Sequence, residues 1–178
     1  MTAKTRAARQ RRGAGVVYVE FLMAFPIVLL FFLSLMELGF LYAASLMLRH
    51  AAVRAARAAS VVLYDNPTYY DNAGAGDLSG RRGEDILLAA TLTMSGLSHV
   101  SNLRVTYPKS PSSNDDQTAL GPEDIVHVRV QADYRCLLPL ASRVVCDAMT
   151  GLRPMESTAS LPVQGASYDA LKREGSDN

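Results

Sequence analysis

The sequence predicts an α+β protein in which a long N-terminal transmembrane α-helix precedes a small head with an antiparallel β-sheet of about three strands. Two observations predict the helix: residues 16–36 are apolar except for Glu20 and Ser34, and an alanine-rich stretch without Gly or Pro comes after them. A third observation predicts the sheet, because strand-like alternation recurs after residue 100. The 178 residues are enough for one modest domain beside a membrane segment.

The membrane helix is the most clearly predicted element. A helix needs about 20 apolar residues to cross the hydrocarbon core, and residues 16–36 meet this length. A secretory signal peptide, the competing interpretation, has a shorter apolar core of roughly 7–15 residues. Because alanine is the best helix former, we expect the helix to run from Val16 to about Val61, a length of about 69 Å. Residues 16–63 are therefore predicted as the transmembrane and extended helix, with Pro26 tolerated inside the span.

Charges on the two flanks of the helix predict its orientation. The arm before Gly15 has five basic residues and no acidic one: Lys4, Arg6, Arg9, Arg11 and Arg12. Short positively charged segments stay in the cytoplasm, so the N-terminus is predicted inside and the head outside. The basic residues 49–57 on the other flank are interpreted as a solvated helix face, with contact to lipid phosphates as the alternative.

The head is predicted over residues 84–165, after a loop at 64–83 that is rich in Gly, Asn, Asp and Pro. A helix is expected at 84–97, where apolar residues recur at helical spacing. Strands are expected at 103–108, 125–135 and 155–163. The polar tail 166–178 is expected to be flexible.

The strand at 125–135 has the clearest alternation in the chain. Its valines are predicted to face the core. His127, Arg129 and Gln131 are predicted on the polar side, so we expect surface exposure for His127 rather than a role as a ligand. The segment after this strand is expected to be a loop with a short helical or hydrophobic patch.

The two cysteines, Cys136 and Cys146, belong to no CxxC pair and to no Cys/His set with metal spacing. A disulfide is chemically permitted if this part of the chain lies outside the cytoplasm, and two free buried thiols are the alternative. A bond would close a loop of about ten residues and add roughly 2–3 kcal/mol to the stability of a small core.

Several classes of function find no support in the sequence. No nucleophile elbow, Walker loop or zinc-protease motif is present, and His50, His99 and His127 are scattered over elements that we predict to be different. The aspartates of residues 64–83 do not have EF-hand spacing. The formal net charge is only +1, and the five basic residues before Gly15 account for this positive charge. Nucleic-acid binding is therefore not expected for the rest of the chain. We therefore predict no catalytic residue, no metal and no cofactor.

A family resemblance begins where the basic arm ends. Gly15 is followed by "VVYVEF", which places Glu20 fifth and Phe21 sixth after the glycine. This register resembles the processing site of type IV prepilins, and more narrowly the TadE-like pseudopilins of the tight-adherence (Flp-type) pilus system. The later "AFPIVLLFFLSLMELGF" and "HAAVRAARAAS" have the same order as in that family. A cut after Gly13 would place Tyr18 at the fifth position, so only Gly15 fits.

The resemblance implies a minor pseudopilin that acts in pilus assembly, adhesion or secretion. It implies a leader at 1–15, cleavage between Gly15 and Val16 by a prepilin peptidase, and a role for Glu20 and Phe21 in assembly. Glu20 would pair with the N-terminal amine of a neighbouring subunit. The implied partners are other pseudopilins, the major pilin, the prepilin peptidase, the inner-membrane pilus platform and membrane lipid.

The implied location is the bacterial inner membrane, in a single pass, with a periplasmic head that becomes pilus-associated or extracellular after assembly. From the residues alone, Glu20 could also reach water at the cytoplasmic interface. The alternative function is an uncleaved, membrane-anchored periplasmic binding or sensor domain. Glu37 is expected to be solvated near the outer interface, and pairing with another subunit is the alternative for it.

Overall fold

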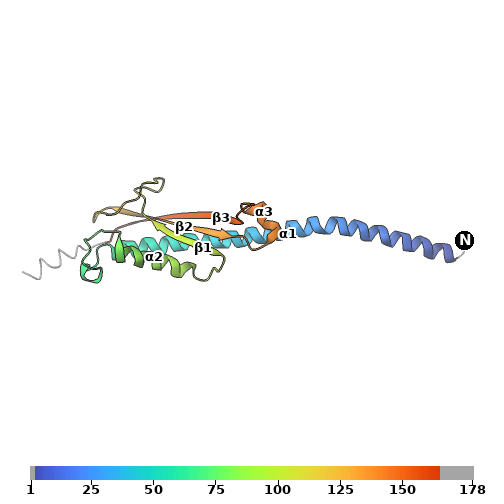
Figure 1. The fold of residues 1–178 in the computed structure, drawn as a ribbon, viewed down its shortest axis with the longest axis horizontal. Helices are drawn as coiled ribbons and strands as arrows, with labels where there is room; N and C mark the ends of the chain where they lie inside the picture. The colour runs from blue at the N-terminus through green and yellow to red at the C-terminus, as the bar shows by residue number, and fades with distance from the viewer. Residues whose placement is uncertain (1–2, 165–178) are drawn as a thin grey trace, which may run out of the picture. The chain divides into compact units, whose positions relative to one another are not determined.

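The structure is a computed structural model that describes residues 3–164, with side chains over 17–138 and 142–164. The predicted flexible tail at 166–178 lies outside the described residues. The elements, in chain order, are α1 (Ala3–Val62), the 3₁₀-helix η1 (Pro67–Tyr69), α2 (Gly80–Met94), β1 (Val100–Thr106), β2 (Ile125–Arg135), α3 (Pro139–Val145) and β3 (Leu152–Pro162) (Figure 1).

The chain divides into two compact units. The first unit consists of Met1–Phe40 together with Cys136–Gly151, so it joins the N-terminal part of α1 to the segment that contains α3. The second unit consists of Leu41–Arg135 together with the part of the chain that begins at Leu152. It contains the rest of α1, α2 and all three strands.

Helix α1 begins at Ala3, thirteen residues before the predicted start at Val16. The early start has a local cause, because residues 3–12 consist of Ala, Lys, Arg and Gln, which are all good helix formers, apart from Thr5. Pro26 lies inside the helix, as expected. The helix ends after Val62, close to Pro67, whose ring disfavours helical backbone in the residue before it.

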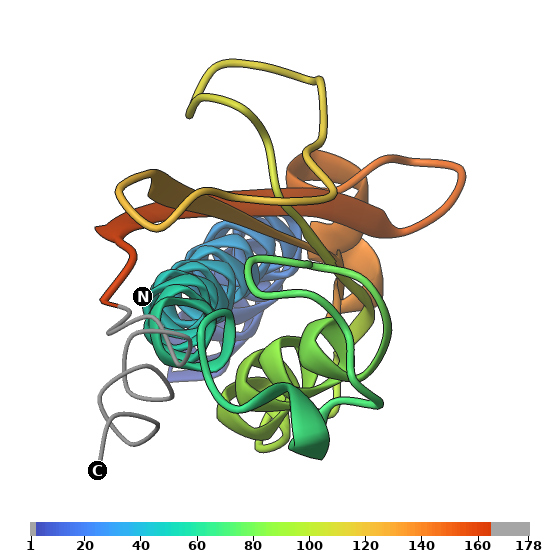
Figure 2. The ribbon, with the colours of Figure 1, turned by 90° about the vertical axis from the view of Figure 1, so that its left-hand side faces the viewer.

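The second unit has two layers, with the sheet over the C-terminal part of α1 and over α2 (Figure 2). The part of α1 in this unit contributes a continuous alanine face, in which Ala51, Ala55 and Ala59 are fully buried. Small side chains allow close approach of the sheet, and the branched core residues of β2 fill the remaining space. The core cluster also includes Ile86 and Ala90 of α2.

The sheet is antiparallel in the order β1-β2-β3, so the predicted three-stranded α+β head is confirmed. Strand β2 coincides with the predicted strand and pairs with β3 along its whole length, from Ile125 opposite Pro162 to Arg135 opposite Leu152. The pairing with β1 is irregular between Ser101 and Arg104. Asn102 lies at this irregularity with a φ of 54°, in the left-handed region that asparagine tolerates better than most residues.

Arg129 corrects the predicted polar face of β2, because it is buried rather than exposed. Its guanidinium donates hydrogen bonds to the carbonyls of Pro111 (3.0 Å) and Ser113 (2.9 Å) and to the Asn114 side chain (3.3 Å). A loop between β1 and β2 therefore reaches across the outer face of the sheet. The alternation gave no indication of this cover, since the loop is polar and far from Arg129 in sequence.

The loop after α1 is fixed to the head by a second arginine, Arg82 of α2, which is fully buried. Its guanidinium donates hydrogen bonds to the carbonyls of Gly74 and Asp65 and lies 4.8 Å from the centre of the Tyr70 ring. Helix α2 begins at Gly80 and so includes Arg82, although the sequence predicted a start at residue 84.

Candidate functional site

The first functional region is the apolar surface of α1. Every residue from Val17 to Phe32 is exposed in the single chain. Among the described residues, Val17–Val62 is one helix that is long and apolar enough to cross a membrane. This exposure is opposite to that of a soluble core helix, which buries its apolar face. The segment is compatible with a single-pass membrane anchor.

The predicted assembly residues lie at the start of this surface. Glu20 is exposed, and no hydrogen bond or ion pair joins it to another described side chain. Phe21 stacks on Phe25 one turn later, with 5.3 Å between the ring centres. Gly15 and Val16 lie within the helical backbone of α1. Glu20 lies four residues after Val16, or about one helical turn, so both positions occur on the same side of the helix.

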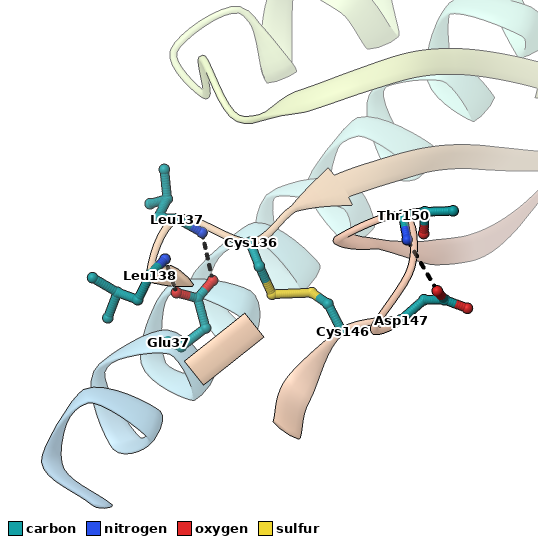
Figure 3. The surroundings of a disulfide bond; sticks show 7 residues. All are labelled: Glu37, Cys136, Leu137, Leu138, Cys146, Asp147 and Thr150. Atoms are coloured by element: carbon teal, nitrogen blue, oxygen red, sulfur yellow. Dashed lines mark hydrogen bonds between the residues drawn. A yellow bond between two sulfur atoms is a disulfide. The ribbon is translucent and has the colours of Figure 1, made fainter. Parts of the chain in front are cut away.

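Glu37 corrects the expectation of a solvated acid, because it is fully buried. Its two carboxylate oxygens accept hydrogen bonds from the backbone N–H groups of Leu137 (3.0 Å) and Leu138 (3.0 Å), immediately before α3 (Figure 3). Charge-assisted bonds of this kind are stronger than bonds between neutral groups. The carboxylate is therefore held within its own chain, within the first compact unit.

The sequence could have indicated that Glu37 needs a partner, because a carboxylate in an apolar segment is costly when unpaired. It could not indicate which partner. The two amides lie 100 and 101 residues later, in a segment without helical or strand periodicity. Every residue except proline has a backbone N–H group, so the identities of Leu137 and Leu138 do not reveal that their amides bind Glu37.

The two cysteines are joined in the structure. The Cys136 and Cys146 sulfurs are 2.00 Å apart, and the bond encloses α3 (Figure 3). Asp147 then accepts hydrogen bonds from the backbone N–H groups of Met149 (2.8 Å) and Thr150 (3.1 Å). These hydrogen bonds lower the pKa of the Asp147 carboxyl below its ordinary value, because they stabilise the ionised form.

The remaining candidate groups do not come together. The basic residues of the C-terminal part of α1 (Arg49, His50, Arg54 and Arg57) are exposed, in agreement with a solvated face. His99 packs edge-on against Tyr134, and His127 shares a hydrogen bond with Ser160 on the strand beside it (2.6 Å). Within residues 3–164, the structure places no three His, Cys, Asp or Glu side chains where they could hold a metal ion.

Comparison with protein families identifies the N-terminal segment. Residues 15–57 match the TadE-like protein family. The resemblance predicted from the prepilin-like register is confirmed over this range. No curated protein and no solved structure matches the chain. The match suggests an association with tight-adherence (Tad) pili.

The TadE-like segment, residues 15–57, begins at Gly15 and contains Val16, Glu20, Phe21 and Glu37. It ends within α1, so it includes the apolar surface and most of the alanine face. The disulfide and the two amides that bind Glu37 lie outside it. The head therefore has to be interpreted from its own geometry.

Proposed function

We propose that this chain is a minor pseudopilin of a tight-adherence (Flp-type) pilus. It is inserted in the inner membrane with its N-terminus in the cytoplasm, and a prepilin peptidase cleaves it after Gly15. The observation that carries the proposal is that the TadE-like segment begins at this glycine and continues directly into the exposed apolar surface of α1. The five basic residues before Gly15 support the orientation.

Cleavage gives Glu20 a partner of opposite charge. It creates a positive α-amino group at Val16, about one helical turn before Glu20. In the single chain Glu20 is exposed on an apolar surface, where an unpaired carboxylate is costly. Pairing with the amine of a neighbouring subunit removes part of this cost and favours side-by-side packing of the membrane helices. Other pseudopilins and the major pilin are the proposed partners, together with the pilus platform.

The experiment that tests the proposal is mass spectrometry of the N-terminus of the protein from the membrane fraction. We expect the mature chain to begin at Val16 and the Gly15→Ala variant to retain its leader. Gly13→Ala is the matched control, because it changes a nearby glycine without changing the register of Glu20, and we expect it to be cleaved normally.

An intact leader in all three proteins would contradict the proposal. It would favour the alternative of an uncleaved anchor that carries a periplasmic binding or sensor domain. A mature chain that starts beyond Leu48 would identify the apolar segment as a removable signal peptide, which would also exclude the pseudopilin mechanism.

A further inference from the structure

The segment Cys136–Gly151, which we name the interface loop, has an unusual surface for its position. It belongs to the same compact unit as the first 40 residues, which include the membrane-facing part of α1. Three of its apolar side chains are exposed: Leu137 by 47%, Val144 by 69% and Met149 by 96%. Its charged residues are only Arg143 and Asp147. A loop in water would not normally expose so many large apolar groups within so few residues.

The contact with Glu37 determines how deep the interface loop lies relative to the proposed membrane span. Glu37 lies 21 residues after Val16, where the apolar run that follows Gly15 begins, and a helix crosses the hydrocarbon core in about 20 residues. Glu37 is therefore placed at the outer boundary of the core. Because its carboxylate binds the amides of Leu137 and Leu138, the interface loop lies at the same level.

Three constraints hold the interface loop in a defined conformation. The disulfide closes it, Glu37 binds its first amides, and Asp147 binds the amides of Met149 and Thr150. Figure 3 shows the backbone N–H groups of Leu137 and Leu138 directed at the carboxylate of Glu37. A loop fixed in this way loses little conformational freedom when its apolar side chains enter another phase.

We propose that the interface loop inserts into the headgroup region of the outer leaflet, as a second membrane contact beside α1. Leu137, Val144 and Met149 enter the boundary between headgroups and acyl chains, and Arg143 binds lipid phosphate. We assign lipid as the occupant of this surface because Glu37 joins the loop to α1 between Met36 and Leu38, two exposed apolar residues of the proposed membrane helix. The inference rests on the membrane insertion included in the proposed function, and it does not require cleavage.

The test uses tryptophan fluorescence of the full chain, which contains no natural tryptophan. Met149→Trp and Val144→Trp report on the interface loop. Leu92→Trp, at an exposed apolar position on α2, is the matched control, and Phe31→Trp reports on insertion of α1. Each variant is reconstituted in vesicles of phosphatidylcholine and phosphatidylglycerol, with bromine on the acyl chains either near the headgroup or near the bilayer centre.

We expect blue-shifted emission from both loop variants and about twofold stronger quenching by the shallow bromines than for Leu92→Trp, since interfacial side chains lie about 5–10 Å inside the headgroup boundary. Equal quenching of the loop and control variants, with Phe31→Trp quenched by deep bromines, would overturn the inference and leave the anchor intact. Absence of quenching in Phe31→Trp would show that α1 does not insert into the bilayer. This result would contradict both the membrane anchor and the present inference. A blue shift that depends on the protein-to-lipid ratio, without quenching, would assign the surface to contact between copies and overturn the lipid inference.

Discussion

Glu37 and Arg82 are fully buried charged side chains, and each of them binds main-chain groups. Glu37 accepts from two amides, and Arg82 donates to two carbonyls. In both cases one buried side chain binds a segment of backbone that lies outside the regular helices and strands. Removal of the side chain leaves buried polar groups unsatisfied, which costs more than a typical hydrogen bond contributes.

Glu37→Gln tests this role in α1. The amide retains one acceptor oxygen, but its NH₂ group faces a backbone donor, so one bond is lost. Loss of a hydrogen bond to a charged group costs about 1.5–3 kcal/mol, and we expect at least about a tenfold increase in hydrogen exchange of the Leu137 and Leu138 amides. The measurement is hydrogen–deuterium exchange of the full chain in detergent.

Glu20→Gln is the matched control for this change, because Glu20 lies on the same helix and is exposed. It should leave the exchange of both amides unchanged. Unchanged exchange in Glu37→Gln as well would mean that the carboxylate does not hold the interface loop.

Arg82→Met tests the second buried charge. The methionine fills part of the volume, but the Asp65 carbonyl loses the guanidinium as a donor, and the Gly74 carbonyl keeps only its bond from the Asp77 N–H (3.2 Å). We expect the free energy of unfolding to fall by about 1.5–3 kcal/mol. Urea unfolding followed by tyrosine circular dichroism provides the measurement. Arg81→Met is the control, because Arg81 is exposed and its ion pair with Asp71 is 3.8 Å long, so its loss should cost no more than about 0.5 kcal/mol. Equal effects of the two changes would show that Arg82 does not stabilise the loop.

The elements differ in how far the sequence could predict them. Strand β2 was predicted residue for residue, because its valines alternate strictly and pack on one face. The start of α2 was missed by four residues, since its first turn has Gly and Arg in place of apolar residues. The cover over Arg129 and the partner of Glu37 could not be predicted, because both depend on contacts between segments far apart in sequence. Local periodicity contains no information about such contacts.

Because of Tyr107, just after β1, we expect the free energy of unfolding to depend on pH in the alkaline range. Burial raises the pKa of Tyr107 to about 12, because the ionised form would lose hydration. A folded-state pKa above the unfolded value of about 10 means that this contribution to stability is complete below pH 10 and is lost as the pH rises toward 12. We expect the free energy of unfolding of the wild type to fall over this range.

The Tyr107→Phe variant cannot ionise at this position, so its stability should fall less between pH 10 and pH 12. Urea unfolding of both proteins at several pH values measures the difference. Parallel loss of stability in the two proteins would assign the alkaline sensitivity to other groups, such as Tyr64 and Tyr70, whose pKa values are also raised by burial.

At the scale of the whole molecule, the two compact units have different means of stabilisation. The second unit has the core cluster of α1, α2 and the sheet, so it gains stability from burial of apolar surface. In the first unit, the interface loop relies on a covalent bond and on hydrogen bonds to Glu37. The two units should therefore respond differently to reduction.

Cys146→Ser, or treatment of the wild type with a thiol reductant, should loosen the interface loop selectively. A disulfide that closes a short loop contributes roughly 2–3 kcal/mol, so amide exchange within residues 136–151 should rise by about 30-fold or more. Exchange in β2 and α2 should remain unchanged. A comparable rise in those two elements would contradict independent stabilisation of the units.

The contact of Glu37 also has a consequence for the order of events during synthesis. The carboxylate leaves the ribosome 100 residues before the first amide that will bind it. At a translation rate of about 5–20 residues per second, the helix carries an unsatisfied acid for about 5–20 s. In the proposed membrane orientation, the polar group opposes burial of this end of the helix in lipid during the interval. In that orientation, α1 can reach its final depth in the membrane only after the segment that contains Leu137 and Leu138 has been synthesised.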